Sequence, residues 1–149
     1  MTREEIMALE PGRELDAMIA EALFGWRKIK GPQYDYDGPC ESNDVLLPPT
    51  ITSEEEAFRF MPPRGVIPYT YFLNHKWSTD ISAAWEVVEK MCHESLAFSF
   101  RLDYHYVLHF ARFIHNDSSY ELEDGEYKSR SAPEAICKAA LLAVMDKEA

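Results

Sequence analysis

The chain has 149 residues, of which 46% are hydrophobic and 13% aromatic, and it carries a formal net charge of −11. This length and composition predict one folded domain with its own core and exclude a chain that is disordered throughout. The acid excess repels phosphate backbones, which argues against a nucleic-acid partner. The three cysteines form no CxxC pair, a usage typical of reduced cytosolic thiols. We find neither a signal-peptide pattern nor an apolar stretch of membrane-spanning length, so no membrane partner is expected.

Two helices and a short strand are predicted before residue 30. Thr2 can cap a short first helix, because its hydroxyl can accept a hydrogen bond from the first turn. Apolar residues then recur at helical spacing over 15–23, and Gly25 follows as a stop signal. The stretch "WRKI" at 26–29 predicts a short strand.

The middle of the chain, from about 30 to 76, predicts a long irregular insertion within the single domain 1–149. It holds seven of the nine prolines, a density that forbids long helices and central strands. Ser53 and Glu56 have capping-box spacing, which predicts one short helix here. Many aromatic residues in the same segment indicate that much of it packs against the rest of the protein.

A third helix is predicted over 79–92, with Thr79 as its N-cap and Asp80 in its first turn. An apolar stripe recurs at helical spacing along it. The stripe consists of Ile81, Ala84, Trp85, Val88 and Cys92.

Antiparallel strands should follow. Apolar and polar residues alternate over 96–102, and the segment from 104 is rich in aromatic and branched residues. If these segments pair as a hairpin, the link at Asp103–Tyr104 must be tight. The cluster at 115–119 predicts a turn, and a further strand is predicted from Tyr120.

The last helix is marked by Ser131 and Glu134 at capping-box spacing, with Pro133 in its first turn. It is apolar nearly all round, which is typical of a helix enclosed between two layers. The chain is therefore predicted to be an α+β protein, in which an antiparallel sheet of three to four strands is layered with helices as an α-β-α sandwich.

The start of the third helix suggests a binding site. A helix N-terminus can hold an anion, nearby hydroxyls can donate to it, and aromatic rings can stack on a base. An arginine beside a glycine could clamp the anion from the loop. The candidate ligand-binding residues are Arg64, Tyr69, Tyr71, Trp77, Ser78 and Thr79. The alternative stays open that Thr79 only caps the helix, Asp80 complements its dipole and Trp77 packs as a hydrophobic staple.

Catalytic and metal sites are not indicated. His105 and His109 are four residues apart on a predicted strand, about 13 Å, which is too far to share one metal ion. Cys92 and His93 diverge around a helix, so they do not form a nucleophile and base. The chain contains no GxSxG, HExxH, P-loop or GxGxxG motif. We expect no catalytic residue, metal or cofactor, and a protein that is not an enzyme.

Three blocks resemble one family. "MTREEIMALEPGRELDAMIAE", "STDISAAWEVVEKM" and "APEAICKAALLAV" resemble the phage ABA-sandwich domain, a family of small bacteriophage proteins. The resemblance implies helix–sheet–helix layers, a phage or prophage source and action in the cytoplasm of the bacterial host. It brings no catalytic motif.

These observations lead to a function hypothesis and an alternative. The first is a phage accessory protein that binds and sequesters a small molecule without chemistry, in a pocket between the long loop and the start of the 79–92 helix. By analogy with other small phage proteins, the ligand would be a host antiviral nucleotide signal. The alternative is a protein-interaction module that inhibits a host protein through its acidic surface. The apolar surface also favours a homo-oligomer.

Overall fold

The computed structural model describes residues 2–30, 44–61, 68–93, 98–115 and 126–148. Within these residues, the antiparallel sheet β3-β4-β5 and the two-stranded sheet β1-β2 are accompanied by five helices, which confirms the α+β prediction. The elements in chain order are α1 (Arg3–Ala8), α2 (Arg13–Leu23), β1 (Arg27–Lys30), β2 (Asp44–Leu47), α3 (Glu54–Phe60), α4 (Ile81–His93), β3 (Phe98–His105), β4 (Leu108–His115), β5 (Glu126–Ser129) and α5 (Ala132–Glu148).

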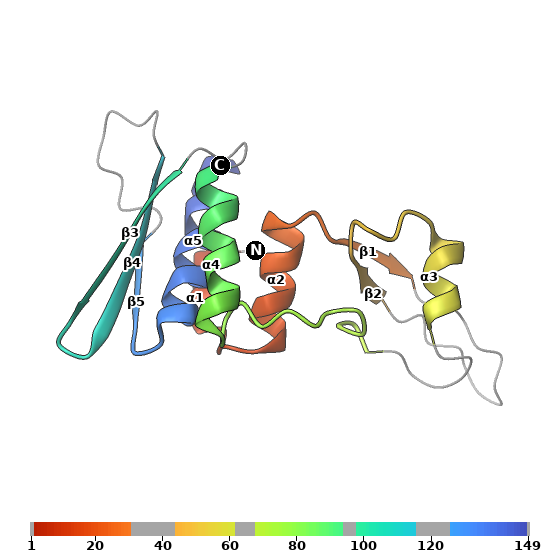
Figure 1. Ribbon diagram of the computed structural model, residues 1–149, viewed down its shortest axis with the longest axis horizontal. Coiled ribbons are helices and arrows are strands. Elements are labelled where there is room, and N and C mark those ends of the chain that lie inside the picture. Colours follow the sequence, from red (N-terminus) through yellow and green to blue (C-terminus); the bar gives the residue numbers. More distant parts are fainter. Residues whose placement is uncertain (1, 31–43, 62–67, 94–97, 116–125, 149) are drawn as a thin grey trace.

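Helix α5 is the centre of the fold, as its all-round apolar sequence predicts. It packs on β4 and β5 with one side and on α1, α2 and α4 with the other (Figure 1). Residues on both sides are fully buried, among them Ile136, Leu141 and Leu142. Each such side chain stabilises the fold by about 1.5–3 kcal/mol. Helices α1, α4 and α5 lie on one face of the three-stranded sheet, and α2 lies beyond them.

Helix α4 starts later and buries a different face than its sequence predicts. Asp80 occupies the N-cap, because its carboxylate accepts from the backbone N–H of Ser82 at 2.9 Å. The predicted cap at Thr79 is therefore wrong. The buried residues are Ala84, Val87, Val88 and Met91, whereas Ile81 and Trp85 remain 49% and 48% exposed. The buried stripe is rotated because α4 packs against both α5 and β3.

Strands β3 and β4 form a hairpin in which Phe98 pairs with His115 and His105 with Leu108. The turn is at Tyr106–Val107, so the predicted link at Asp103–Tyr104 is wrong. Both turn residues have positive φ, 54° and 58°, as a type I′ turn requires to match the twist of the strands. The prediction of a further strand is confirmed by β5, but 120–125 and most of the predicted turn at 115–119 lie outside the described residues.

The middle of the chain folds into a small unit of its own. The predicted strand is confirmed as β1, and Ser53 caps α3 by accepting from the N–H of Glu56 at 3.1 Å. Strand β2, which was not predicted from the sequence, pairs with β1. A small cluster holds the unit together, comprising Val45, Leu47, Ile51, Ala57 and Met61. Figure 1 shows the unit beside α2 and far from the three-stranded sheet. Most of its apolar residues find partners within the unit, but Leu46 packs into the main core. The last part of the predicted insertion also packs there, through Leu73 and Trp77, as its aromatic residues predict.

Candidate functional site

The stretch before α4 is built into the core. Trp77 is only 1% exposed, and its ring stacks between Phe24 and His75 with centroid distances of 4.7 and 4.6 Å. Its indole N–H donates to Glu86 on α4 at 3.1 Å. Both faces of the ring and its only donor are thus engaged within the protein, as the alternative of a packed Trp77 expected.

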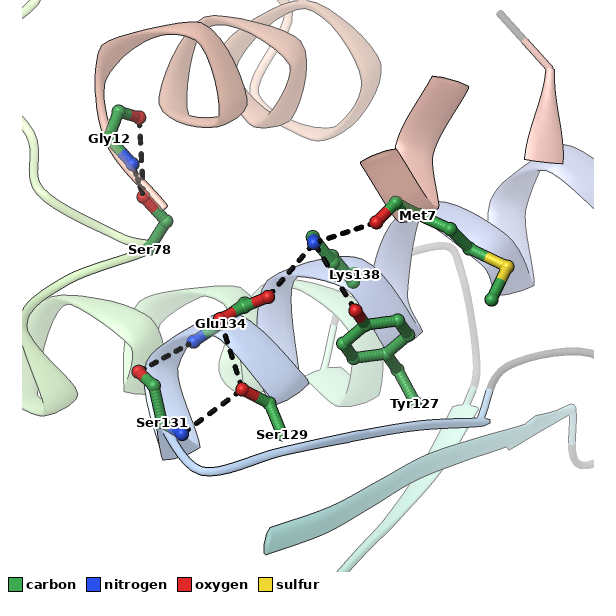
Figure 2. Close-up of polar contacts among 8 residues, drawn as sticks. All are labelled: Met7, Gly12, Ser78, Tyr127, Ser129, Ser131, Glu134 and Lys138. Carbon is green, nitrogen blue, oxygen red and sulfur yellow. Dashed lines mark hydrogen bonds and ion pairs between the residues drawn. The ribbon is translucent and has the colours of Figure 1, made fainter. Parts of the chain in front are cut away.

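Ser78 is fully buried and connects α2 to the segment before α4. Its backbone N–H donates to Asp16 Oδ1 at 2.7 Å, and its hydroxyl accepts from the N–H of Gly12 at 2.9 Å. Figure 2 shows the contact with Gly12. Burial raises the pKa of Asp16, and the hydrogen bonds from Ser78 partly oppose this rise. These bonds fix the start of α2 against the start of α4.

The five predicted ligand-binding residues that the structure describes differ in their surroundings, since Trp77 and Ser78 are buried whereas others reach the surface. Thr79 is exposed, and Tyr71, which is 41% exposed, donates from its hydroxyl to the carbonyl of Phe60 at 3.1 Å. Arg64 lies outside the described residues. Tyr69 lines a groove beside α2. Ligand contacts at the remaining positions stay predictions.

This groove, which we call the α2 groove, has a volume of about 560 Å³ and lies between α2, the β1–β2 sheet and the Tyr69–Thr70 turn. Such a volume falls in the range of small-molecule sites. Its lining residues are Leu9, Arg13, Glu14, Ala17, Met18, Glu21, Lys28, Asp44, Tyr69 and Thr70.

Tyr69 is held at the groove from three sides. Its carbonyl accepts from the N–H of Leu46 at 3.0 Å, and its hydroxyl donates to Glu21 on α2. The ammonium of Lys28 lies 5.6 Å from the centroid of its ring, within cation–π reach. Burial, and then the neighbouring Glu21, raise the pKa of Tyr69. The phenol therefore stays protonated at neutral pH and is a donor rather than a nucleophile.

The charges of the groove are mixed. Arg13 donates to the hydroxyl of Thr70 at 3.4 Å, and Lys28 is the second cation. Three carboxylates, those of Glu14, Glu21 and Asp44, also line it. A groove lined by two cations and three carboxylates is better suited to a ligand with few negative charges than to a polyphosphate.

A family model, described as the phage ABA sandwich domain, matches residues 17–141. The chain belongs to the phage ABA sandwich domain family. This confirms the predicted resemblance to the family, and it makes the chain a phage protein. No curated protein and no solved structure gave a match.

Among the described residues of this phage ABA sandwich domain, the most buried cation was not identified from the sequence. Lys138 is 2% exposed in the middle of α5, and its ammonium donates to Glu134 at 2.9 Å, the Met7 carbonyl at 3.2 Å and the Tyr127 hydroxyl at 3.3 Å. Figure 2 shows this network, in which Ser129 also donates to Glu134. All three ammonium protons have acceptors, so Lys138 is a structural residue. The only available signal was a lone charge within an apolar helix.

The described part of this ABA sandwich domain contains no group of three or more side chains that could hold a metal ion. Among the same residues, no helix is both long and apolar enough to cross a membrane.

Proposed function

We propose that this phage protein binds a small polar molecule in the α2 groove and sequesters it without chemical change. The observation that carries the proposal is the meeting of three kinds of side chain in one groove. Leu9, Ala17 and Met18 offer apolar surface, Tyr69 offers a ring, and Arg13 with Lys28 offers positive charge. Binding sites for small ligands combine such apolar walls with a few polar groups.

A nucleotide with one or two phosphate groups fits this chemistry. Its base would lie on the apolar surface near Met18, and a phosphate group would be held by Arg13 and Lys28. The carboxylates of Glu14 and Asp44 would accept from ribose hydroxyls or base amino groups. Sequestration of such a nucleotide would remove a host antiviral signal from the cytoplasm of the infected bacterium.

Calorimetry with cyclic and ADP-ribose-type nucleotides tests this proposal. We expect Arg13→Gln and Lys28→Gln each to weaken binding about 10-fold, because each removes one charge-assisted hydrogen bond. Lys128→Gln on β5, an exposed cation on another element, is the matched control and should leave affinity unchanged. Ligand recovered unaltered after incubation supports sequestration. Absence of heat with every nucleotide, or conversion to a product, would overturn it.

The alternative, inhibition of a host protein through an acidic surface, is favoured by one feature, helix α3. Its first turn carries Glu54, Glu55 and Glu56, and next to them Phe58 and Phe60 are 38% and 60% exposed. Exposed aromatic rings with a polar rim are typical of protein-binding surfaces, and here the three carboxylates would form part of that rim. This function would be favoured over the first if the wild type captures a defined host protein, if Phe60→Ser loses that capture and if Arg13→Gln keeps it.

A further inference from the structure

Strand β3 is an edge strand that exposes apolar side chains. The strand order β3-β4-β5 places it at the border of the sheet (Figure 1), and within the described residues it pairs only with β4. Leu102 and Tyr104 are 36% and 63% exposed, on the same face of the strand as Phe100. A long apolar edge of this kind tends to pair with another strand.

The backbone of β3 is oriented for such pairing. The turn at Tyr106–Val107 contains two residues, so the flanking pair His105–Leu108 is hydrogen-bonded in the hairpin. Hydrogen-bonded and non-hydrogen-bonded pairs then alternate along the strands. The N–H and C=O groups of Phe100, Leu102 and Tyr104 consequently point away from β4 and toward the outer edge.

We propose that two copies of this chain pair antiparallel along β3, about a two-fold axis that passes through Leu102. In this register Leu102 meets its counterpart, and Phe100 faces Tyr104 of the second copy. On the opposite face Arg101 lies across from Asp103 of the second copy, and the symmetry repeats this pair. The edge is therefore self-complementary in charge and in shape, as a two-fold interface requires, and it forms about six backbone hydrogen bonds.

The charges select this register over its neighbours. An axis through residue 101 would place Arg101 opposite itself, and an axis through residue 103 would place Asp103 opposite itself. Like charges directly opposite each other destabilise strand pairs. The axis through Leu102 instead joins unlike charges twice, so the sequence Arg101-Leu102-Asp103 is what identifies a second copy as the partner.

Helix α4 extends the interface beyond the strand. The ring of Trp85 contacts Phe100 edge-on, with centroids 5.8 Å apart, and remains about half exposed. Ile81, one helical turn earlier, is equally exposed. Pairing along β3 brings the two α4 helices of the dimer toward each other, so these apolar side chains become more buried. The two sheets become one continuous sheet with helices on the same face.

Sedimentation velocity over about 1–100 µM, where weak dimers dissociate, tests the dimer with charge exchanges. We expect a wild-type dimer that Arg101→Asp and Asp103→Arg each weaken at least about 10-fold, because two attractive pairs become repulsive. The double exchange R101D/D103R restores unlike pairs and should restore the dimer. Lys128→Asp, on the other edge strand β5, is the control and should not weaken it.

The single exchanges also break an exposed Arg101–Asp103 ion pair within one copy, at 2.8 Å, but such pairs contribute little to stability. Should a single variant fail to fold, Leu102→Cys replaces it. Hydrogen-bonded partners are about 5.5 Å apart, within reach of a disulfide, so oxidation should cross-link this variant and not Lys128→Cys. The proposal would be overturned if the wild type is monomeric throughout or if the single exchanges leave the dimer unaffected. It would also be overturned if the double exchange fails to restore the dimer or if no cross-link forms. A monomer that pairs β3 with a strand of another protein would do so as well.

Discussion

At the scale of single residues, the buried carboxylate of Asp16 decides how two helix starts are joined. It is almost without contact to solvent, yet it accepts the backbone N–H of Ser78, which would otherwise be buried without an acceptor. An unsatisfied buried N–H costs about 1–3 kcal/mol. The hydrogen bond offsets part of the cost of removing the carboxylate from water, and the raised pKa of Asp16 reflects what remains.

Asp16→Asn should therefore change how stability depends on pH. Burial raises the pKa of Asp16 above its ordinary 3.8. At a pH between 3.8 and the raised pKa, the folded protein therefore binds more protons at this site than the unfolded chain does. The contribution of Asp16 is complete below 3.8 and is lost as pH rises through the raised pKa. Urea unfolding of both proteins at a series of pH values measures it. The free energy of unfolding of the wild type minus that of the variant should fall with rising pH, and a difference that rises would contradict the assignment.

Lys138→Met should be strongly destabilising, although the change is to an apolar residue. It leaves the carboxylate of Glu134, the carbonyl of Met7 and the hydroxyl of Tyr127 without the ammonium that serves all three. Removing one member of a buried pair costs about 3–5 kcal/mol. Lys128→Met, at an exposed site, should remain within about 0.5 kcal/mol of the wild type. Denaturant unfolding checks both, and a fully stable Lys138→Met would contradict the structural role.

These residues also show which contacts a local sequence pattern cannot predict. The stretch around Ser78 was correctly marked as a helix start, because caps and first-turn acids are local signals. Its true partner, Asp16, is 62 positions away, and no local pattern reveals a contact of that range. The same holds for Trp77, whose spacing could not distinguish a ring that stacks on a ligand from one that stacks on Phe24 and His75.

At the scale of elements, local signals were sufficient: helical periodicity for α2, the capping box for α5, and alternation for the existence of the β3–β4 hairpin. Strand β2 was missed because it buries residues of both faces, Val45 and Leu47 in the small cluster and Leu46 in the main core. It therefore shows no alternation, and prolines follow it directly. The turn of the hairpin was misplaced because Tyr106 and Val107 are residues that turns of this type rarely contain.

Those two residues predict a gain in stability on replacement. Positive φ costs a non-glycine residue about 1–2 kcal/mol, and both turn residues have it. Tyr106→Asn with Val107→Gly, the pair that type I′ turns prefer, should raise the free energy of unfolding by about 1–2 kcal/mol. Val107→Ala, which keeps a Cβ, is the control and should bring little of this gain. Thermal unfolding would measure it, and a double variant no more stable than the wild type would count against the turn geometry.

At the scale of the whole molecule, strand β2 connects two hydrophobic clusters, and Phe72 packs against both of them. The main core surrounds α5, and the small cluster lies between β2 and α3. Because Leu46 packs into the main core and its neighbours Val45 and Leu47 into the small cluster, β2 connects them. The α2 groove lies at this junction, with Arg13 and Met18 from the main body and Lys28 and Asp44 from the small unit. Its shape depends on how the unit sits against α2.

The small unit should therefore open at a lower free energy than the main body, since fewer buried apolar side chains hold it. Val45→Ala should speed hydrogen exchange in β1, β2 and α3 and leave α5 unchanged, whereas Leu141→Ala should lower protection throughout by about 2–5 kcal/mol. Native-state hydrogen exchange read by mass spectrometry separates the two. If Val45→Ala weakened the protection of α5 as much as that of β2, the molecule would be one cooperative unit.

A ligand in the α2 groove contacts both the main body and the small unit, so it should slow hydrogen exchange in β1 and β2 selectively. A ligand bound elsewhere should not.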